Sequence, residues 1–92
     1  MEKSIFIVSY TSYCDEIYNN VIPFTNKEDA IETANNYVEE VNERVKTSES
    51  NKDFSNYENG YKEISIKDHY RGNEFLISIT EFKTLLSFKN IK

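Results

Sequence analysis

The chain has 92 residues, of which 38% are hydrophobic and 14% aromatic; this suits one folded domain over residues 1–92 and excludes a disordered chain. A domain this small buries too little surface to enclose a large substrate pocket. Its net charge of −5 at pH 7 disfavours direct binding to nucleic acid or to an anionic membrane, and it attracts a basic partner instead.

Two strands are expected in the first 24 residues. Residues 4–11 are β-branched and aromatic, and Ile5-Phe6-Ile7-Val8 places apolar side chains on both faces, as is typical of a central strand. This apolar run is far too short to cross a membrane. A second strand is predicted at 17–24, where Pro23 cannot donate to a β-ladder and therefore indicates a sheet edge.

The best-specified element is a helix from Thr25 to about Lys46. Thr25 and Glu28 fit a capping box, in which the threonine hydroxyl accepts from a first-turn amide and the glutamate reaches back. The apolar residues share an arc about 120° wide at helical pitch, and acidic residues fill an arc of about the same width on the opposite side. The apolar arc holds Ala30, Ile31, Ala34, Tyr37, Val38, Val41 and Val45, and the acidic arc holds Glu28, Asp29, Glu32, Glu39, Glu40 and Glu43.

The segment after the helix is predicted to form a loop and then a β-hairpin. Residues 47–60 are polar without periodicity, and a long loop of this kind is often functional or mobile. Residues 61–69 alternate around Ile64 and Ile66, and residues 74–80 alternate as well, with a turn between them. This pattern is typical of two antiparallel strands.

The tail 81–88 places Phe82, Leu85 and Leu86 at helical spacing, which predicts a short second helix, with a fifth strand as the alternative. The predicted order is therefore β-β-α-β-β with a short C-terminal helix. We expect an α+β fold in which one long amphipathic helix packs on a face of a small antiparallel sheet.

No residue pattern indicates an enzyme. A cysteine nucleophile needs an imidazole and an orienting group, and Cys14, His69 and Asp68 supply these residue types. However, no glycine-shaped turn surrounds Cys14, and neighbouring strand residues such as Asp68 and His69 point to opposite faces. One Cys and one His cannot close a four-ligand zinc site, and two glycines cannot form a phosphate-binding loop. We therefore expect no catalytic residue, metal or cofactor.

One small region combines tyrosine with basic residues. Tyr61, Tyr70 and Arg71 belong to it, and tyrosine is enriched at interface hot spots because it buries a large ring and keeps a polar tip. Half-exposed strands also favour tyrosine, so ordinary cross-strand packing is the alternative. The three residues form a secondary candidate patch.

The acidic face of the helix is the main candidate site. Glu28–Glu32 and Glu39–Glu43 are like-charged pairs at i,i+4, each costing about 0.2–0.5 kcal/mol, whereas Glu40–Arg44 is attractive. A solvated face that keeps the protein soluble is one interpretation. The other is a surface that meets Lys and Arg on a partner, where binding relieves the repulsion. The predicted partner-binding residues are Glu28, Glu32, Glu39, Glu40 and Glu43.

Residue usage favours an AT-rich genome, because Gly, Pro, Ala and Arg together supply only seven residues while Asn, Lys and Ile are abundant. With its small size, acidity and capped acidic helix, the chain resembles the small acidic inhibitors encoded by phages and mobile elements, anti-CRISPR and other anti-defence proteins among them. This resemblance implies a non-enzymatic inhibitor that occupies the basic, nucleic-acid-binding surface of a larger host protein. A single cysteine precludes an internal disulfide and favours a reducing bacterial cytoplasm.

Self-association is the alternative function. In that case the chain is a small structural or regulatory homodimer that pairs through a sheet edge or through the apolar tail Phe82–Phe88. The two functions predict different behaviour, since an acidic binding face needs a basic partner and a self-associating protein needs only a second copy of itself.

Overall fold

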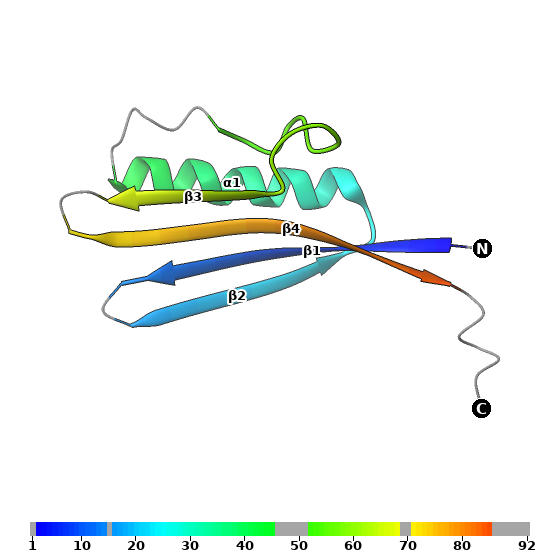
Figure 1. Cartoon of the computed structure of the whole chain (residues 1–92), viewed down its shortest axis with the longest axis horizontal. Coiled ribbons are helices and arrows are strands. Elements are labelled where there is room, and N and C mark those ends of the chain that lie inside the picture. Colours follow the sequence, from blue (N-terminus) through cyan, green and yellow to red (C-terminus); the bar gives the residue numbers. More distant parts are fainter. Residues whose placement is uncertain (1, 15, 46–51, 69–70, 86–92) are drawn as a thin grey trace.

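The computed structural model describes residues 2–14, 16–45, 52–68 and 71–85 of the chain. In these residues a four-stranded antiparallel sheet has the strand order β2-β1-β4-β3, and one helix lies along it (Figure 1). The α+β class expected from the sequence is therefore confirmed. The elements are β1 (Glu2–Tyr13), β2 (Ile17–Phe24), α1 (Lys27–Val45), β3 (Glu63–Asp68) and β4 (Asn73–Leu85).

The two longest strands, β1 and β4, pair at the centre of the sheet from Tyr13↔Glu74 to Glu2↔Leu85. Because side chains alternate across a strand, Val8 and Ile77 face α1 and are fully buried, while Ile7 faces the other side. The central position predicted for the first strand is confirmed. β2 is an edge strand, as Pro23 predicted.

The helix begins one residue later than the capping-box prediction required. Asn26, not Thr25, caps it: the Asn26 Oδ1 accepts from the Glu28 amide at 2.8 Å and from the Asp29 amide at 3.3 Å. The Asn26 carbonyl accepts the first helical hydrogen bond, from the Ala30 amide at 3.2 Å. The assignment of Thr25 as the cap was therefore wrong, because an asparagine, which caps at least as well, stands next to it.

The apolar arc of α1 packs on the sheet as predicted. Ala30 and Ala34 are fully buried and Val38 and Val41 nearly so, and the two small side chains let the helix lie close to β1. In the middle of the helix, the Tyr37 ring stacks on the Tyr10 ring with a centroid distance of 4.7 Å. The helix is therefore held along its length by apolar contact with the core.

Residues 52–62 form an irregular segment that packs against α1 and completes the core. Phe54 is fully buried and Tyr57 is 4% exposed, with the Tyr57 ring edge-on to Phe6. Asn35 of α1 holds the segment, since its Oδ1 accepts from the Phe54 amide at 2.7 Å and its Nδ2 donates to Ser55 Oγ at 3.3 Å. The polar sequence did not indicate this packing. The predicted loop also includes residues 46–51, which lie outside the described residues.

The predicted C-terminal helix is wrong for residues 81–85, which continue β4. Their backbone pairs with the first residues of β1, for example Phe82 with Ile5 and Leu85 with Glu2. Strand pairing prevails because β1 starts early enough to offer hydrogen-bond partners along this whole stretch. In Figure 1 the two strands extend together beyond the end of the helix. Residues 86–88 of the predicted helix lie outside the described part.

Truncating Phe54 to alanine should lower the free energy of unfolding by about 3–5 kcal/mol, because removal of this fully buried ring leaves a cavity in the core. The matched control is Tyr61→Ala in the same segment, where the tyrosine is 46% exposed and the expected loss is below about 1 kcal/mol. Urea unfolding followed by circular dichroism measures both. Equal losses in the two variants would contradict the packing of residues 52–62.

Replacing Asn26 by alanine should destabilise the protein by about 1 kcal/mol, because two first-turn amides lose their acceptor. Thr25→Ala should change the stability by less than about 0.5 kcal/mol, since Thr25 lies outside the helix. The same urea titration ranks the two variants, and a larger loss at Thr25 would restore the capping-box assignment.

Candidate functional site

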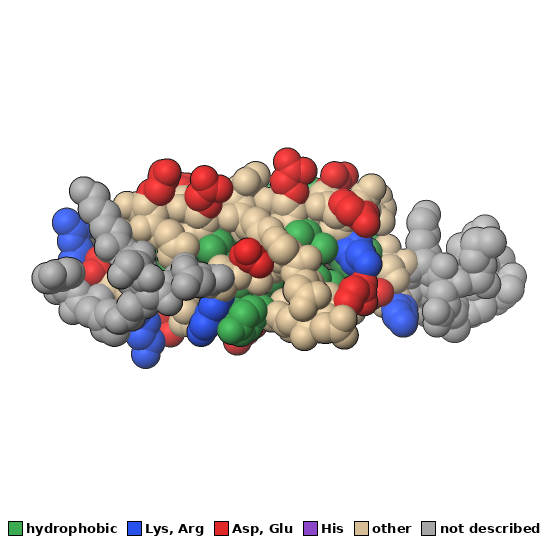
Figure 2. Space-filling model, turned by 90° about the horizontal axis from the view of Figure 1, so that it is seen from above, with side chains coloured by type: hydrophobic (Ala, Val, Ile, Leu, Met, Phe, Trp, Pro, Cys, Tyr) green, Lys and Arg blue, Asp and Glu red, His purple; other side chains and the backbone are tan. Residues whose placement is uncertain are grey.

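The glutamates predicted for partner binding form a row on the outer side of α1. Glu28, Glu32, Glu39, Glu40 and Glu43 are all exposed. Figure 2 shows acidic side chains gathered along one long side of the molecule. The row follows from helical spacing opposite the buried Ala30, Ala34, Val38 and Val41, so the packing of the apolar arc directs the acidic arc into solvent.

The row is poorly compensated by positive charge. Arg44 Nη2 lies 3.5 Å from Glu40 Oε1, and both side chains are more than half exposed, so this pair is weak. Glu32, Glu39 and Glu43 make no ion pair or side-chain hydrogen bond with any other described residue. These three carboxylates are therefore available to a partner.

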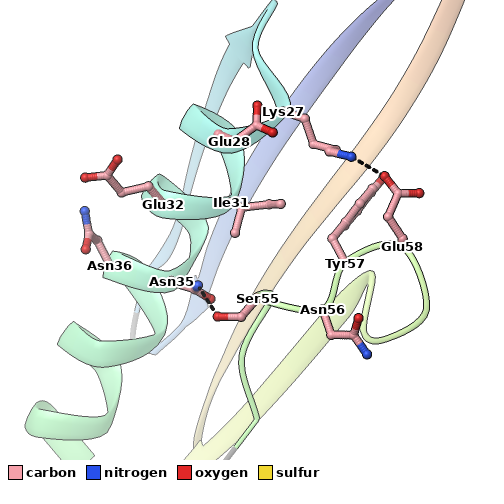
Figure 3. Close-up of a pocket in the computed structure, with 10 residues that line it drawn as sticks. All are labelled: Lys27, Glu28, Ile31, Glu32, Asn35, Asn36, Ser55, Asn56, Tyr57 and Glu58. Carbon is pink, nitrogen blue, oxygen red and sulfur yellow. Dashed lines mark hydrogen bonds and ion pairs between the residues drawn. The ribbon is translucent and has the colours of Figure 1, made fainter.

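A groove lies between the first half of α1 and residues 55–58. Its volume is about 550 Å³. Ile31 points from the helix toward Tyr57 and forms an apolar floor, while Glu32 and Asn36 point away from the groove at its outer rim (Figure 3). The groove therefore combines an apolar base with carboxylates. It is lined by Lys27, Glu28, Ile31, Glu32, Asn35, Asn36, Ser55, Asn56, Tyr57 and Glu58.

Lys27 and Glu58 close one end of this groove by an ion pair between the start of α1 and the irregular segment (Figure 3). The hydrogen bond from Lys27 and its positive charge lower the pKa of the Glu58 carboxyl, and the same contact raises the pKa of the Lys27 ammonium. Both side chains are accessible to water, which screens the pair. Lys27 is therefore already paired with Glu58, and within the acidic row its charge acts on the neighbouring Glu28 only.

The irregular segment has its own internal support. Lys62 Nζ donates to the Tyr57 carbonyl and lies 4.2 Å from the centroid of the Tyr57 ring. Burial raises the pKa of the Tyr57 hydroxyl. At Gly60 a Cβ would lie 2.6 Å from the Asn56 carbonyl oxygen, so the turn requires glycine there. These contacts hold the wall of the groove in place.

A second groove, of about 470 Å³, continues along the other half of α1. Glu39 and Glu43 lie on its helix side, and Lys52 and Asp53 lie on the side of the irregular segment. The seam between α1 and residues 52–58 is therefore hollowed beside both ends of the acidic row.

Two residues of the secondary patch, Tyr61 and Arg71, lie in the described part of the chain. Tyr61 precedes β3 and Arg71 follows it, so the six-residue strand separates them by about 20 Å at 3.3 Å per residue. Tyr70 lies outside the described residues. Tyr61 instead has Lys52 as its basic neighbour, with Lys52 Nζ 5.5 Å from the ring centroid.

Of the residues weighed for catalysis, the structure describes Cys14 and Asp68. Cys14 is exposed, and its Sγ lies 3.1 Å from Ser12 Oγ. His69 lies outside the described residues. Over the described ranges no three His, Cys, Asp or Glu side chains are grouped to hold a metal ion. α1, the helix of the described residues, is not long and apolar enough to span a membrane.

Comparison of the chain with protein-family models, with curated proteins and with solved structures finds no match. The acidic row and the adjoining grooves are therefore the observations that bear on function. The sequence identified the acidic row, but it missed Asn35, Tyr57 and Glu58 as parts of the adjoining groove. The only available signal was the pair of aromatic residues, Phe54 and Tyr57, three positions apart in a polar stretch.

The Lys27–Glu58 pair should make stability depend on pH in a defined direction. The pKa of Glu58 is lowered on folding, so its contribution is present above the ordinary value near 4.5 and is lost as the pH falls through the lowered pKa. The pKa of Lys27 is raised, so its contribution is lost only as the pH rises above about 10.5.

Wild type should therefore be more stable than Glu58→Gln at neutral pH, and the difference should disappear in acid. Urea unfolding at a series of pH values measures this difference. Glu16→Gln, in the turn between β1 and β2, is the control and should show no such difference, because Glu16 makes no ion pair with any described residue. A difference that does not shrink as the pH falls below the ordinary pKa of glutamate would contradict the assigned pair.

Proposed function

We propose that this protein is a non-enzymatic binding module whose acidic row occupies a basic, nucleic-acid-binding surface of a larger protein. The observation that carries the proposal is the set of exposed carboxylates Glu32, Glu39 and Glu43 on one side of α1, which make no ion pair with any other described residue. A row of this kind is complementary to a surface that normally holds phosphates.

Repulsion within the row favours a cationic partner. Glu28–Glu32 and Glu39–Glu43 each cost about 0.2–0.5 kcal/mol in the free protein. A lysine or arginine placed between two such carboxylates converts this cost into attraction, so part of the binding energy comes from relief of repulsion. The interaction acts most strongly where water and salt are displaced from the interface.

The length of the row suits a nucleic-acid channel. From Glu28 to Glu43 the helix rises about 22 Å, which is similar to the length of about seven phosphates on one strand at 3.4 Å each. The carboxylates are fixed by a packed helix, so little conformational order has to be gained on binding. The protein therefore presents a rigid anionic edge of the size of a short nucleic-acid segment.

The first groove adds specificity to this electrostatic attraction. A lysine or arginine side chain of the partner can lay its aliphatic stem on Ile31 and Tyr57 while its charged group reaches Glu28 or Glu58. The amide groups of Asn35 and Asn56 line the same groove and can hydrogen-bond to the partner. This combination distinguishes one basic surface from another.

The small size, the acidity and the AT-rich residue usage support a phage- or mobile-element-encoded inhibitor of the anti-CRISPR or another anti-defence type. Such an inhibitor acts in the bacterial cytoplasm and prevents its target from binding nucleic acid. It requires no metal or cofactor, because it acts by occupying a surface.

The test compares two triple variants that change the net charge equally. Glu32→Lys, Glu39→Lys and Glu43→Lys together should weaken binding to the partner at least about 100-fold, since three attractive contacts become repulsive. The control combines Glu16→Lys, Glu63→Lys and Glu81→Lys, which are exposed residues away from the outer face of α1, and should stay within about threefold of wild type.

The partner is first captured from the native host with immobilised wild type and identified by mass spectrometry. Calorimetry with the purified partner then measures both variants, and competition with the partner's own nucleic acid measures overlap of the two sites. Binding by wild type should weaken as salt is raised. Equal affinity of the two triple variants, or simultaneous binding of nucleic acid, would refute the proposal.

A further inference from the structure

The sheet has a second face that points away from α1 and from the core. Because β1 is central, alternate residues such as Ile5 and Ile7 face this side, and they lie beside Phe82 of β4 and Pro23 of β2 in the strand register. None of them belongs to the buried core. We call this surface the open face: the side of the four strands opposite α1.

The open face carries most of the exposed large apolar side chains. Among the described residues, six such side chains are exposed, and four of them lie on this face: Tyr13, Ile17, Val21 and Phe82. Ile17 is 73% exposed and Val21 and Phe82 are each about half exposed. Uncharged polar residues such as Ser9, Thr11 and Ser78 lie between these apolar side chains. Exposed apolar side chains gathered on the solvent face of an antiparallel sheet favour a surface that another molecule covers.

The distribution of charge on the open face indicates what kind of molecule covers it. Between 5 and 13 in β1 and between 17 and 23 in β2, no residue on the open face is charged. Among the residues whose side chains the structure describes, the charged ones on this face are Glu63, Lys67 and Glu74, in β3 and the adjoining end of β4, where Lys67 lies opposite Glu74. Two copies can therefore approach through this face without repulsion, and their acidic rows then point outward on opposite sides.

The two edge strands, β2 and β3, are less suited to pairing than the open face; among the described residues, β4 also has an edge beyond Ile79. β2 contains Pro23, which lacks a backbone donor, and β3 has only six residues with Glu63 and Lys67 among them. Prolines, short length and charge are the devices by which edge strands avoid adding a further strand. The apolar surface lies on the face of the sheet and not on its edge.

The size of the open face matches a dimer interface. β1 and β4 pair over 12 residues, and with the shorter flanking strands the flat area is about 600 Å² at a rise of 3.3 Å and a strand spacing of 4.8 Å. Because side chains project from the sheet, the accessible surface area is larger than this flat area and approaches the roughly 800 Å² per partner of a standard interface. Two sheets can pack face to face at about 10 Å.

We propose that two copies of the chain associate by packing their open faces together. The product has two sheets at the centre and the two helices outside, each with its acidic row exposed to solvent. This arrangement presents two rows to partners at once and differs from pairing through a sheet edge or through the tail. It does not depend on the proposed function of the acidic row.

Light scattering and sedimentation equilibrium of wild type from about 1 to 500 μM should show a dimer that dissociates on dilution. Phe82→Lys should weaken the dimer at least about tenfold, because a charge is then buried in the interface. Phe82 lies beyond the residues of β4 that pair with β3, so the cysteine at position 78 is what separates face-to-face packing from pairing along this edge. Tyr18→Lys, an equally large change at an exposed tyrosine on the α1 side of β2, where its ring contacts Tyr10, should leave the dimer intact.

A second measurement does not depend on a disruptive change. Ser78, near the middle of the open face opposite Ser9, is replaced by cysteine in a Cys14→Ser background, and a parallel protein carries the cysteine at Asn36 on α1. Alkylation of the cysteine at 78 should become at least about tenfold slower as concentration rises through the dissociation constant, while the cysteine at 36 should react at one rate throughout.

A wild-type protein that is monomeric at 500 μM would overturn the proposal. So would a dimer that keeps its affinity in Phe82→Lys and leaves the cysteine at 78 reactive, because this dimer would pair through an edge or the tail. The triple variant of Glu32, Glu39 and Glu43 should remain dimeric, so loss of partner binding and loss of dimerisation can be told apart.

Discussion

β1 and β4 pair backbone to backbone over 12 residue pairs, and this ladder determines where the other elements lie. It places one alternate set of side chains, including Val8 and Ile77, under the helix and the other set on the open face. α1 can lie close to the sheet because Ala30 and Ala34 face it, and the acidic arc is then directed into solvent. The position of the candidate site therefore follows from the packing of its opposite side.

The two sides of the molecule differ sharply in chemistry. The α1 side carries exposed carboxylates without an ion-pair partner among the described residues, together with the two grooves described above. The open face carries exposed apolar side chains with no charge between residues 5 and 13 of β1 and between 17 and 23 of β2. Charge complementarity favours a basic partner on the first side. The absence of repulsion favours a second copy on the other. The two surfaces do not overlap, so one protein can use both at the same time.

The irregular segment 52–62 links the core to the site. Phe54 and Tyr57 fill the space beside α1, and Asn35 and the Lys27–Glu58 pair fix the segment from the helix. The same residues that complete the core also form the wall of the first groove. A change in this segment therefore affects stability and the shape of the groove together.

The sequence by itself determined the α+β class, the central and edge positions of the first two strands, and the amphipathic helix with its acidic row. Each of these follows from local periodicity or from one residue with a fixed property, such as Pro23. Only the tertiary structure decided three further features. Residues 81–85 are strand because the start of β1 pairs with them. Asn26 caps α1 because its side-chain oxygen, and not the Thr25 hydroxyl, accepts from the first-turn amides. Tyr57 and Glu58 form a groove because Asn35 holds their segment from 19 residues away. Long-range contacts of this kind leave no periodic signal in the chain, since they depend on which segments the fold brings together.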